Sequence, residues 1–113
     1  MVKDTVLIFS RNGMGVAPQE LQLGLVSKFF PLTLQSGQLP AKVVFYTAGV
    51  KLCCTGSPIL DSLKVLEAEG VELVLCSTCL TFYGLEEQVE VGVVGGMGDI
   101  LTALQMAPKV ISL

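Results

Sequence analysis

The chain has 113 residues, 51% of them hydrophobic and 15% charged, with a net charge of −3 and a pI near 4.7. A chain of this length buries roughly two-thirds of its unfolded surface, so we expect one domain over residues 1–113 that needs no disulfide to fold. The acidic balance, without any basic stripe, argues against a nucleic-acid partner. No apolar run reaches the roughly 20 residues of a spanning helix, which argues against a membrane partner.

The first part of the sequence predicts two strands and a helix. The continuous apolar run Thr5–Phe9 is typical of a strand covered on both faces, as in parallel sheets. A polar, glycine-bearing loop follows at residues 10–15. Pro18, near the start of the next apolar pattern, predicts a helix N-terminus, and we expect Pro31 to kink or shorten this helix. Residues 42–46 predict the second strand.

A loop without clear periodicity, residues 50–56, follows the second strand. Ser57 is suited to cap a helix whose first position is Pro58, and apolar residues at helical spacing continue to Gly70. Asp99 is expected to help cap the last helix. The remaining expected segments are a strand at 71–75, a loop at 76–79, a short helix at 80–85, a strand at 89–94, a flexible turn at 95–98, a helix ended by Pro108, and a strand at 109–113.

This alternation of strand and helix predicts a three-layer α/β/α fold with a mainly parallel sheet of about five strands. In such a sheet the strand-to-helix loops share the carboxyl edge, where ligands bind. We therefore expect residues 10–15, 49–56, 76–79 and 95–98 to lie along one edge. All four cysteines of the chain belong to these segments.

Cys76 and Cys79 form a C-x-x-C motif where the third strand meets a helix. Unpaired N–H groups at a helix N-terminus stabilise negative charge and lower the pKa of a thiol from its usual value of about 8.5. The motif therefore predicts a nucleophilic site with Cys76 and Cys79 as its catalytic residues. The alternative is that both are small buried hydrophobic residues.

Other residues at this edge are candidates for binding. Lys51 can hold an anion or stabilise a thiolate, although a solvated loop lysine fits the sequence equally well. Cys53 and Cys54 are adjacent and point in different directions, so we expect only one to face the site. Adjacent cysteines fit zinc geometry badly and the chain has no histidine, so we expect no metal site and no cofactor. The remaining candidates are the edge glycines Gly49, Gly96 and Gly98, for which turn formation is the alternative role.

Several blocks of the sequence resemble a known family. They are LQLG in the first helix, GVKL after the second strand, CxxCL followed by FYGL, and the closing KVISL. Together they resemble the DsrE/DsrF-like sulfur-relay superfamily, most closely the sulfurtransferase-like C-terminal domain of YedF-type selenium-metabolism proteins. The resemblance covers essentially the whole chain. It implies a three-layer α/β/α fold, a homo-oligomer, and a cysteine after the third strand that carries persulfide sulfur.

The resemblance also implies roles for the two motif cysteines. By position, the persulfide-carrying cysteine corresponds to Cys76, and Cys79 matches the second cysteine of the YedF-type pattern. YedF-type proteins usually carry an N-terminal sulfur-carrier domain with a Cys-Pro motif, and this chain has neither. We therefore expect a separate sulfur-carrier or sulfur-donor protein as partner.

Composition indicates an assembly and a compartment. A charged fraction of 15% falls well below the usual quarter or so, which leaves apolar surface for a homo-oligomer interface. The N-terminus is typical of a first strand rather than a signal peptide, and the sparse cysteines suit a reducing compartment. We therefore expect a cytoplasmic protein.

Three functions remain open from the sequence. The first is a sulfurtransferase-like sulfur relay in which Cys76 accepts sulfane sulfur and Cys79 resolves or releases it. The second is a dithiol-disulfide oxidoreductase that cycles the same two thiols, although the chain lacks the thioredoxin pattern and has no tryptophan. The third is a non-catalytic oligomeric binding module in which the cysteines only pack.

Overall fold

The structure is a computed structural model and describes residues 4–113. Five strands form one sheet in the order β4-β3-β2-β1-β5, and every neighbouring pair is parallel. The carboxyl ends of the strands therefore share one edge, as the sequence predicts. The strands are β1 (Thr5–Phe9), β2 (Lys42–Phe45), β3 (Glu72–Cys76), β4 (Val93–Gly95) and β5 (Lys109–Ser112).

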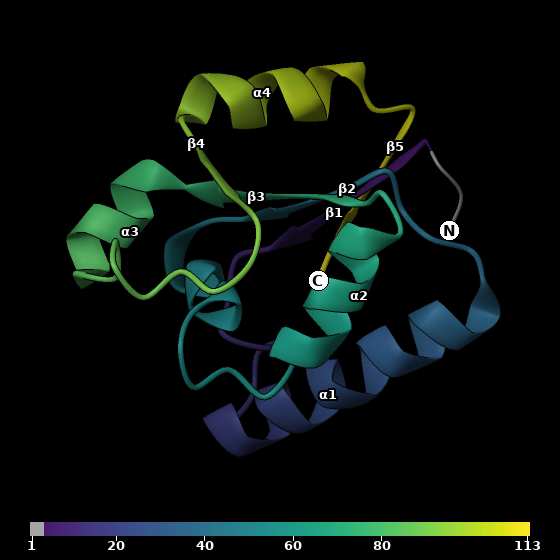
Figure 1. The fold of residues 1–113 in the computed structure, drawn as a ribbon, viewed down its shortest axis with the longest axis horizontal. Coiled ribbons are helices and arrows are strands. Elements are labelled where there is room, and N and C mark those ends of the chain that lie inside the picture. The colour runs from purple at the N-terminus through teal and green to yellow at the C-terminus, as the bar shows by residue number, and fades with distance from the viewer. Residues whose placement is uncertain (1–3) are drawn as a thin grey trace.

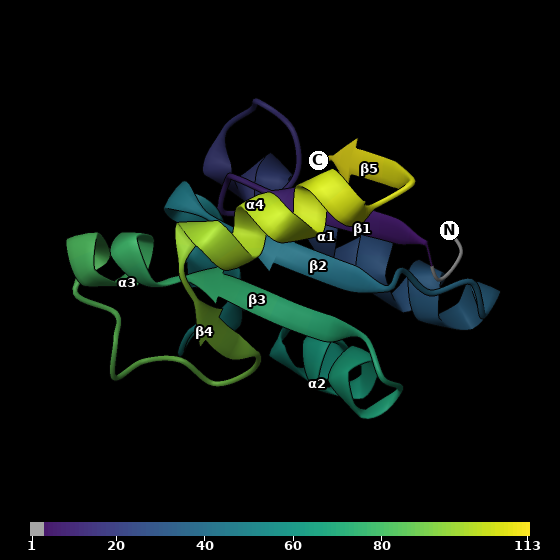
Figure 2. The same ribbon diagram turned by 90° about the horizontal axis from the view of Figure 1, so that it is seen from above.

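Helices cover both faces of the sheet, which confirms the three-layer α/β/α fold. Figure 1 shows α1 and α2 on one face and α4 on the other, with α3 beyond the end of β3. Viewed from above, α4 crosses the strands (Figure 2), because it connects the edge strand β4 to the opposite edge strand β5. The helices are α1 (Gln19–Ser36), the 3-10 helix η1 (Thr47–Cys53), α2 (Leu60–Ala68), α3 (Ser77–Tyr83) and α4 (Met97–Met106).

The main hydrophobic core lies between the sheet and the α1–α2 layer. The ring of Phe9 in β1 packs on Phe45 of β2 and on Phe30 of α1, with ring centroids 5.8 and 5.3 Å apart. α1 buries Val26, Phe30 and Thr33, which lie on one helix face because they are three or four residues apart. Burying one large apolar side chain stabilises a fold by about 1.5–3 kcal/mol, so this layer holds α1 firmly on the sheet.

One helix is longer than the sequence suggests. α1 continues through Pro31 to Ser36, so the expectation that Pro31 shortens it is wrong. Proline cannot donate a backbone hydrogen bond to the preceding turn. The buried side chains of Phe30 and Thr33, on either side of it, keep the helix on the sheet despite that loss.

The sequence predicts a loop at residues 76–79 and a turn at residues 95–98, at the starts of α3 and α4, but these residues belong largely to strands and helices. Cys76 is the last residue of β3 and α3 begins at Ser77, so residues 76–79 are not a loop and Cys79 lies in the first helical turn. α4 already begins at Met97, so residues 95–98 are not a free turn. The Asp99 carboxylate accepts the Gly96 N–H at 2.9 Å, which confirms Asp99 as a cap.

Two further boundaries shift. β4 begins at Val93 rather than at residue 89, because Gly92 has φ +88° and breaks the strand before it. α2 begins at Leu60, two residues after the expected first position Pro58, and the Ser57 hydroxyl accepts the N–H of Ile59 at 3.3 Å just ahead of it. Among residues 4–113 no helix combines the length and hydrophobicity needed to cross a membrane.

Candidate functional site

The candidate site forms where three adjacent strands end. β1, β2 and β3 lie side by side, so the segments that follow them meet at the carboxyl edge. Thr47, just after β2, donates its hydroxyl to the carbonyl of Ser10, just after β1. The backbone N–H of Thr47 donates to the Sγ of Cys79, after β3, at 3.0 Å. Thr47 therefore connects the ends of three strands and positions one motif thiol.

Thr47 has an unusual backbone conformation. Its φ of 47° makes it the only non-glycine residue with positive φ among residues 4–113. A β-branched residue in this region costs about 1–3 kcal/mol and persists only where the surroundings impose it, commonly at functional sites. The sequence analysis missed Thr47, because nothing but its position after the second strand distinguishes it from other threonines.

The two motif thiols differ in exposure. Cys76 is 0% exposed, whereas Cys79 is half-buried. Burial and a hydrogen bond with the Cys76 side chain raise the pKa of Cys79, and the Thr47 N–H partly opposes this by lowering it. The expectation of a lowered pKa at the helix N-terminus is therefore wrong for Cys79, because burial outweighs the backbone donor.

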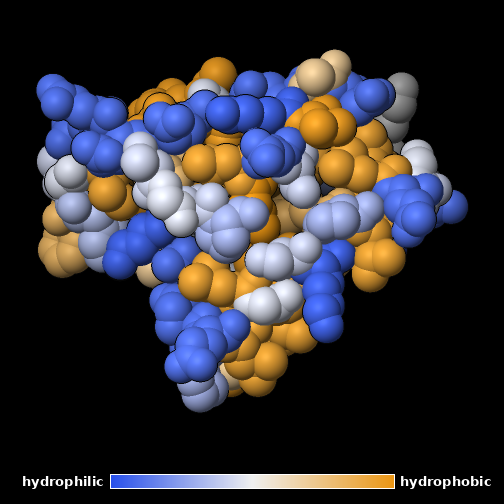
Figure 3. All heavy atoms as spheres, turned by 60° about the horizontal axis from the view of Figure 1, so that its bottom comes forward, coloured by the Kyte–Doolittle hydropathy of each residue, from blue (hydrophilic) through white to orange (hydrophobic). Residues whose placement is uncertain are grey.

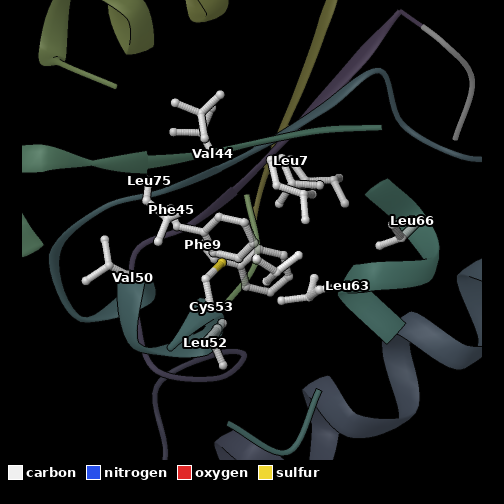
Figure 4. Packing of buried hydrophobic residues seen from close by; sticks show 14 of the residues in the cluster. Leu7, Phe9, Val44, Phe45, Val50, Leu52, Cys53, Leu63, Leu66 and Leu75 are labelled. Carbon is white, nitrogen blue, oxygen red and sulfur yellow. The ribbon is translucent and has the colours of Figure 1, made fainter. Parts of the chain in front are cut away.

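Cys53 lies in the core rather than at the site. It is 0% exposed, and Figure 4 shows its sulfur directed toward the phenylalanine rings of the core, beside Phe9. Burial, followed by the proximity of Cys54 and Glu67, raises the pKa of Cys53 well above the usual thiol value. Cys53 therefore behaves as a packing residue.

Cys54 faces a different direction, as expected for a neighbour of Cys53, and lines a pocket. Its Sγ donates a hydrogen bond to the Val50 carbonyl at 3.3 Å. Burial, followed by the nearby Glu90, raises the pKa of Cys54, so this thiol is protonated at neutral pH.

The pocket lies along the contact between η1 and α3. These elements pack together through the Thr47–Cys79 hydrogen bond and, four residues further along each, through Lys51 and Tyr83. The Nζ of Lys51 is 4.5 Å from the centroid of the Tyr83 ring, a cation–π contact. Lys51, Cys54 and Tyr83 belong to the wall of this pocket, which has a volume of about 410 Å³.

The three candidate glycines have structural surroundings. A Cβ on Gly49 would lie 1.9 Å from the carbonyl oxygen of Phe9, so only glycine lets η1 approach the end of β1 this closely. Gly96 precedes the first turn of α4, and Gly98 lies inside that turn. None of the three lines the pocket that contains Lys51.

Within the part of the chain that the structure describes, no group of three or more His, Cys, Asp or Glu residues is placed to hold a metal ion. The site therefore consists of a thiol pair, a backbone donor and an adjacent pocket with one lysine. Residues 27–113, which contain both thiols, Thr47 and Lys51, match the DsrE/DsrF-like family.

The chain belongs to the DsrE/DsrF-like family. Solved structures similar to this DsrE/DsrF-like chain include the YchN protein from E. coli, with a TM-score of 0.72 and 21% identity over 100% of both chains. MTH1491 from Methanobacterium thermoautotrophicum has a TM-score of 0.69 and 19% identity, covering 96% of this chain and 97% of its own. BT1422 from Bacteroides thetaiotaomicron has a TM-score of 0.68 and 15% identity, covering 96% of this chain and 93% of its own. These likenesses establish the fold, and no curated protein matches the sequence significantly.

Hydrophobic residues of this DsrE/DsrF-like chain also reach the surface. Figure 3 shows them in several patches between hydrophilic residues. One group lies on the edge strand β4 and on the adjoining helix α4, and each of its members is more than half exposed. These residues, called the β4–α4 surface below, are Val93, Val94, Met97 and Leu101.

Proposed function

We propose that this protein carries sulfane sulfur as a cysteine persulfide on the Cys76–Cys79 pair, and that Cys79 reacts first. The observation that carries the proposal is the environment of the Cys79 sulfur. It is half-buried and receives the Thr47 N–H at 3.0 Å, next to a second thiol, at the carboxyl edge of a DsrE/DsrF-like fold. Membership of that family supports sulfur relay as the class of function.

The geometry favours an order of events that differs from the sequence expectation. Cys76 is completely buried, so an incoming donor reaches Cys79 more easily. The Cys79 thiolate attacks the outer sulfur of a donor R–S–SH, the S–S bond breaks, R–S⁻ leaves, and Cys79–S–SH forms. An acceptor thiolate then removes the outer sulfur in the same way and regenerates the Cys79 thiolate. The Thr47 N–H stabilises the negatively charged sulfur at each stage.

The test is intact-protein mass spectrometry after incubation with a persulfide donor in the absence of reductant, followed by peptide mapping. We expect one sulfur atom to be added to Cys79 in the wild type and none in Cys79→Ser. Cys53→Ala is the matched control, because it removes a thiol that packs in the core outside the pocket and leaves the pair intact, and we expect it to load normally. Loading that persists in Cys79→Ser would refute Cys79 as the first acceptor.

A dithiol-disulfide oxidoreductase is the second candidate, favoured by the hydrogen bond between the Cys76 and Cys79 side chains. Thiols in this contact can form a disulfide with loss of two hydrogens once an external oxidant accepts the electrons. The same mass measurement separates the two functions, because a persulfide adds the mass of one sulfur atom, whereas a disulfide lowers the mass by two hydrogen atoms.

The finer assignments extend the proposal. The CxxCL and FYGL blocks support a YedF-type branch of the family, and a separate carrier or donor protein would supply or take up the sulfur. All four cysteines are free thiols, which suits the reducing cytosol. The exposed β4–α4 surface supports a homo-oligomer, because an apolar edge strand is a ready site for pairing with another chain.

A further inference from the structure

We infer that the pocket between η1 and α3 binds the small-molecule sulfur donor, and that this donor is an organic persulfide with a negatively charged group. The inference rests on the proposed function and names the substrate class of the same site. It is carried by the charge of the pocket, by its volume and lining, and by its position relative to Cys79.

The wall of the pocket itself carries one charged side chain, that of Lys51, and the Cys54 thiol in the same wall is protonated at neutral pH. The carboxylate of Glu90 does not line the pocket; it lies behind the wall, 3.5 Å from the Thr55 hydroxyl. Among residues 4–113 the one ion pair joins Lys42 to Glu72, so Lys51 has no carboxylate partner. Its ammonium group lies instead over the Tyr83 ring. A cation held in this way, without a counter-ion, selects an anionic ligand.

A second donor is available beside the cation. The Ser57 hydroxyl, in the same wall, accepts the N–H of Ile59 at 3.3 Å. Its own proton has no acceptor within the described part of the chain, so it is free to donate to a ligand oxygen. Lys51 and Ser57 together can therefore bind a carboxylate.

The size and lining of the pocket indicate an organic ligand. Its volume of about 410 Å³ lies within the range of roughly 300–1,000 Å³ that is typical of small-molecule sites. Leu23, Pro58 and Leu85 add apolar surface to the polar groups. An inorganic anion would leave most of this apolar wall unused, whereas a short carbon chain would cover it.

The position of the pocket connects it to the thiol. Tyr83 follows Cys79 by four residues in α3, so the two side chains lie on the same face of the helix, with Cβ atoms about 5–6 Å apart. A donor whose carboxylate binds Lys51 can extend its persulfide along this face. The Cys79 thiolate then takes the outer sulfur, Cys79–S–SH forms, and the donor leaves as its thiolate, with no oxidant or reductant consumed.

The test compares two small donors that differ in charge: mercaptopropionate persulfide, which carries a carboxylate, and mercaptoethanol persulfide, which does not. The rate of sulfur addition to Cys79 is followed by mass spectrometry. We expect the wild type to load about tenfold faster from the carboxylate donor, the low end of what a charge-assisted hydrogen bond provides. Lys51→Gln should lose this preference while still loading from mercaptoethanol persulfide.

Matched variants separate the pocket from general charge effects. Lys64→Gln removes the same charge from an exposed position on α2 and should keep the preference. Tyr83→Leu removes the ring under Lys51 and should reduce the preference for the carboxylate donor. Equal loading from both donors in the wild type, or a preference that survives Lys51→Gln, overturns the pocket inference while the proposed relay stands. Failure of Cys79 to load from either donor overturns both.

Discussion

The backbone N–H of Thr47 donates a hydrogen bond to the Cys79 sulfur at 3.0 Å, although the two residues are 32 positions apart in the chain. Thr47 has a φ of 47°, and its hydroxyl donates a hydrogen bond to the carbonyl of Ser10. A substitution at position 47 keeps the backbone N–H, but the direction of that N–H depends on the hydrogen bond that the Thr47 side chain makes.

Thr47→Val keeps the shape of the side chain and the N–H but removes the hydroxyl that binds Ser10. We expect the N–H to be less well aimed at Cys79, and the pKa of Cys79 to rise further. The measurement is the pH dependence of Cys79 alkylation, read by peptide mapping, with a several-fold lower rate expected near pH 8. Thr55→Val is the control, because Thr55 also binds a backbone carbonyl, that of Gln88, away from the thiol pair. An unchanged Cys79 profile in Thr47→Val would contradict the role of Thr47.

The raised pKa of the thiols predicts how stability changes with pH. Burial raises the pKa of Cys53, Cys54 and Cys79 in the folded protein. At neutral pH these thiols are protonated in the folded and in the unfolded protein, and the free energy of unfolding is then at its full value. Above the unfolded thiol pKa of about 8.5 the unfolded chain ionises first, and the free energy of unfolding falls as pH rises. Urea unfolding at pH 7 and at pH 9.5 measures this loss. Cys53→Ala should show a smaller loss between the two pH values, and an equal loss would exclude Cys53 as a contributor.

Gly49→Ala should destabilise the fold strongly. The added Cβ would lie 1.9 Å from the Phe9 carbonyl oxygen, so η1 must move away from β1. We expect a loss of at least about 2 kcal/mol in the free energy of unfolding, measured by urea denaturation. Gly24→Ala is the contrasting change: it lies on the exposed side of α1, with nothing within 4 Å of its added Cβ. Because alanine favours a helix interior, it should stabilise by about 0.5–1 kcal/mol.

Leu101→Glu should weaken self-association through the β4–α4 surface. Leu101 is 52% exposed and lies on α4 beside the apolar edge strand, so a charge there would be buried unpaired in an interface. Light scattering coupled to size-exclusion chromatography should show a shift toward the monomer. Gln105→Glu adds the same charge at an exposed, already polar position of α4 and should leave the mass unchanged. A wild type that is monomeric at all concentrations would contradict the proposed assembly.

Much of the fold was predictable because local patterns carry it. The apolar run Thr5–Phe9 and the Asp99 cap are determined by neighbouring residues, and the alternation of strands and helices predicts a parallel sheet with a common carboxyl edge. The same reasoning placed Cys76 at a strand end. It did not extend to Pro31, where the burial of neighbouring side chains outweighs the local preference of proline.

The sequence by itself determined which segments are strands and helices and that two thiols lie at the carboxyl edge, since periodicity and turn chemistry act over a few residues. Only the tertiary structure decided the strand order, which of Cys53 and Cys54 faces the pocket, the approach of Thr47 to Cys79, and the Lys51–Tyr83 contact. These depend on which side chains pack against one another across the sheet. The ionisation of Cys79 belongs to the same group, because its burial and the hydrogen bond from Thr47 arise from the tertiary structure, and the C-x-x-C motif shows only the neighbouring Cys76.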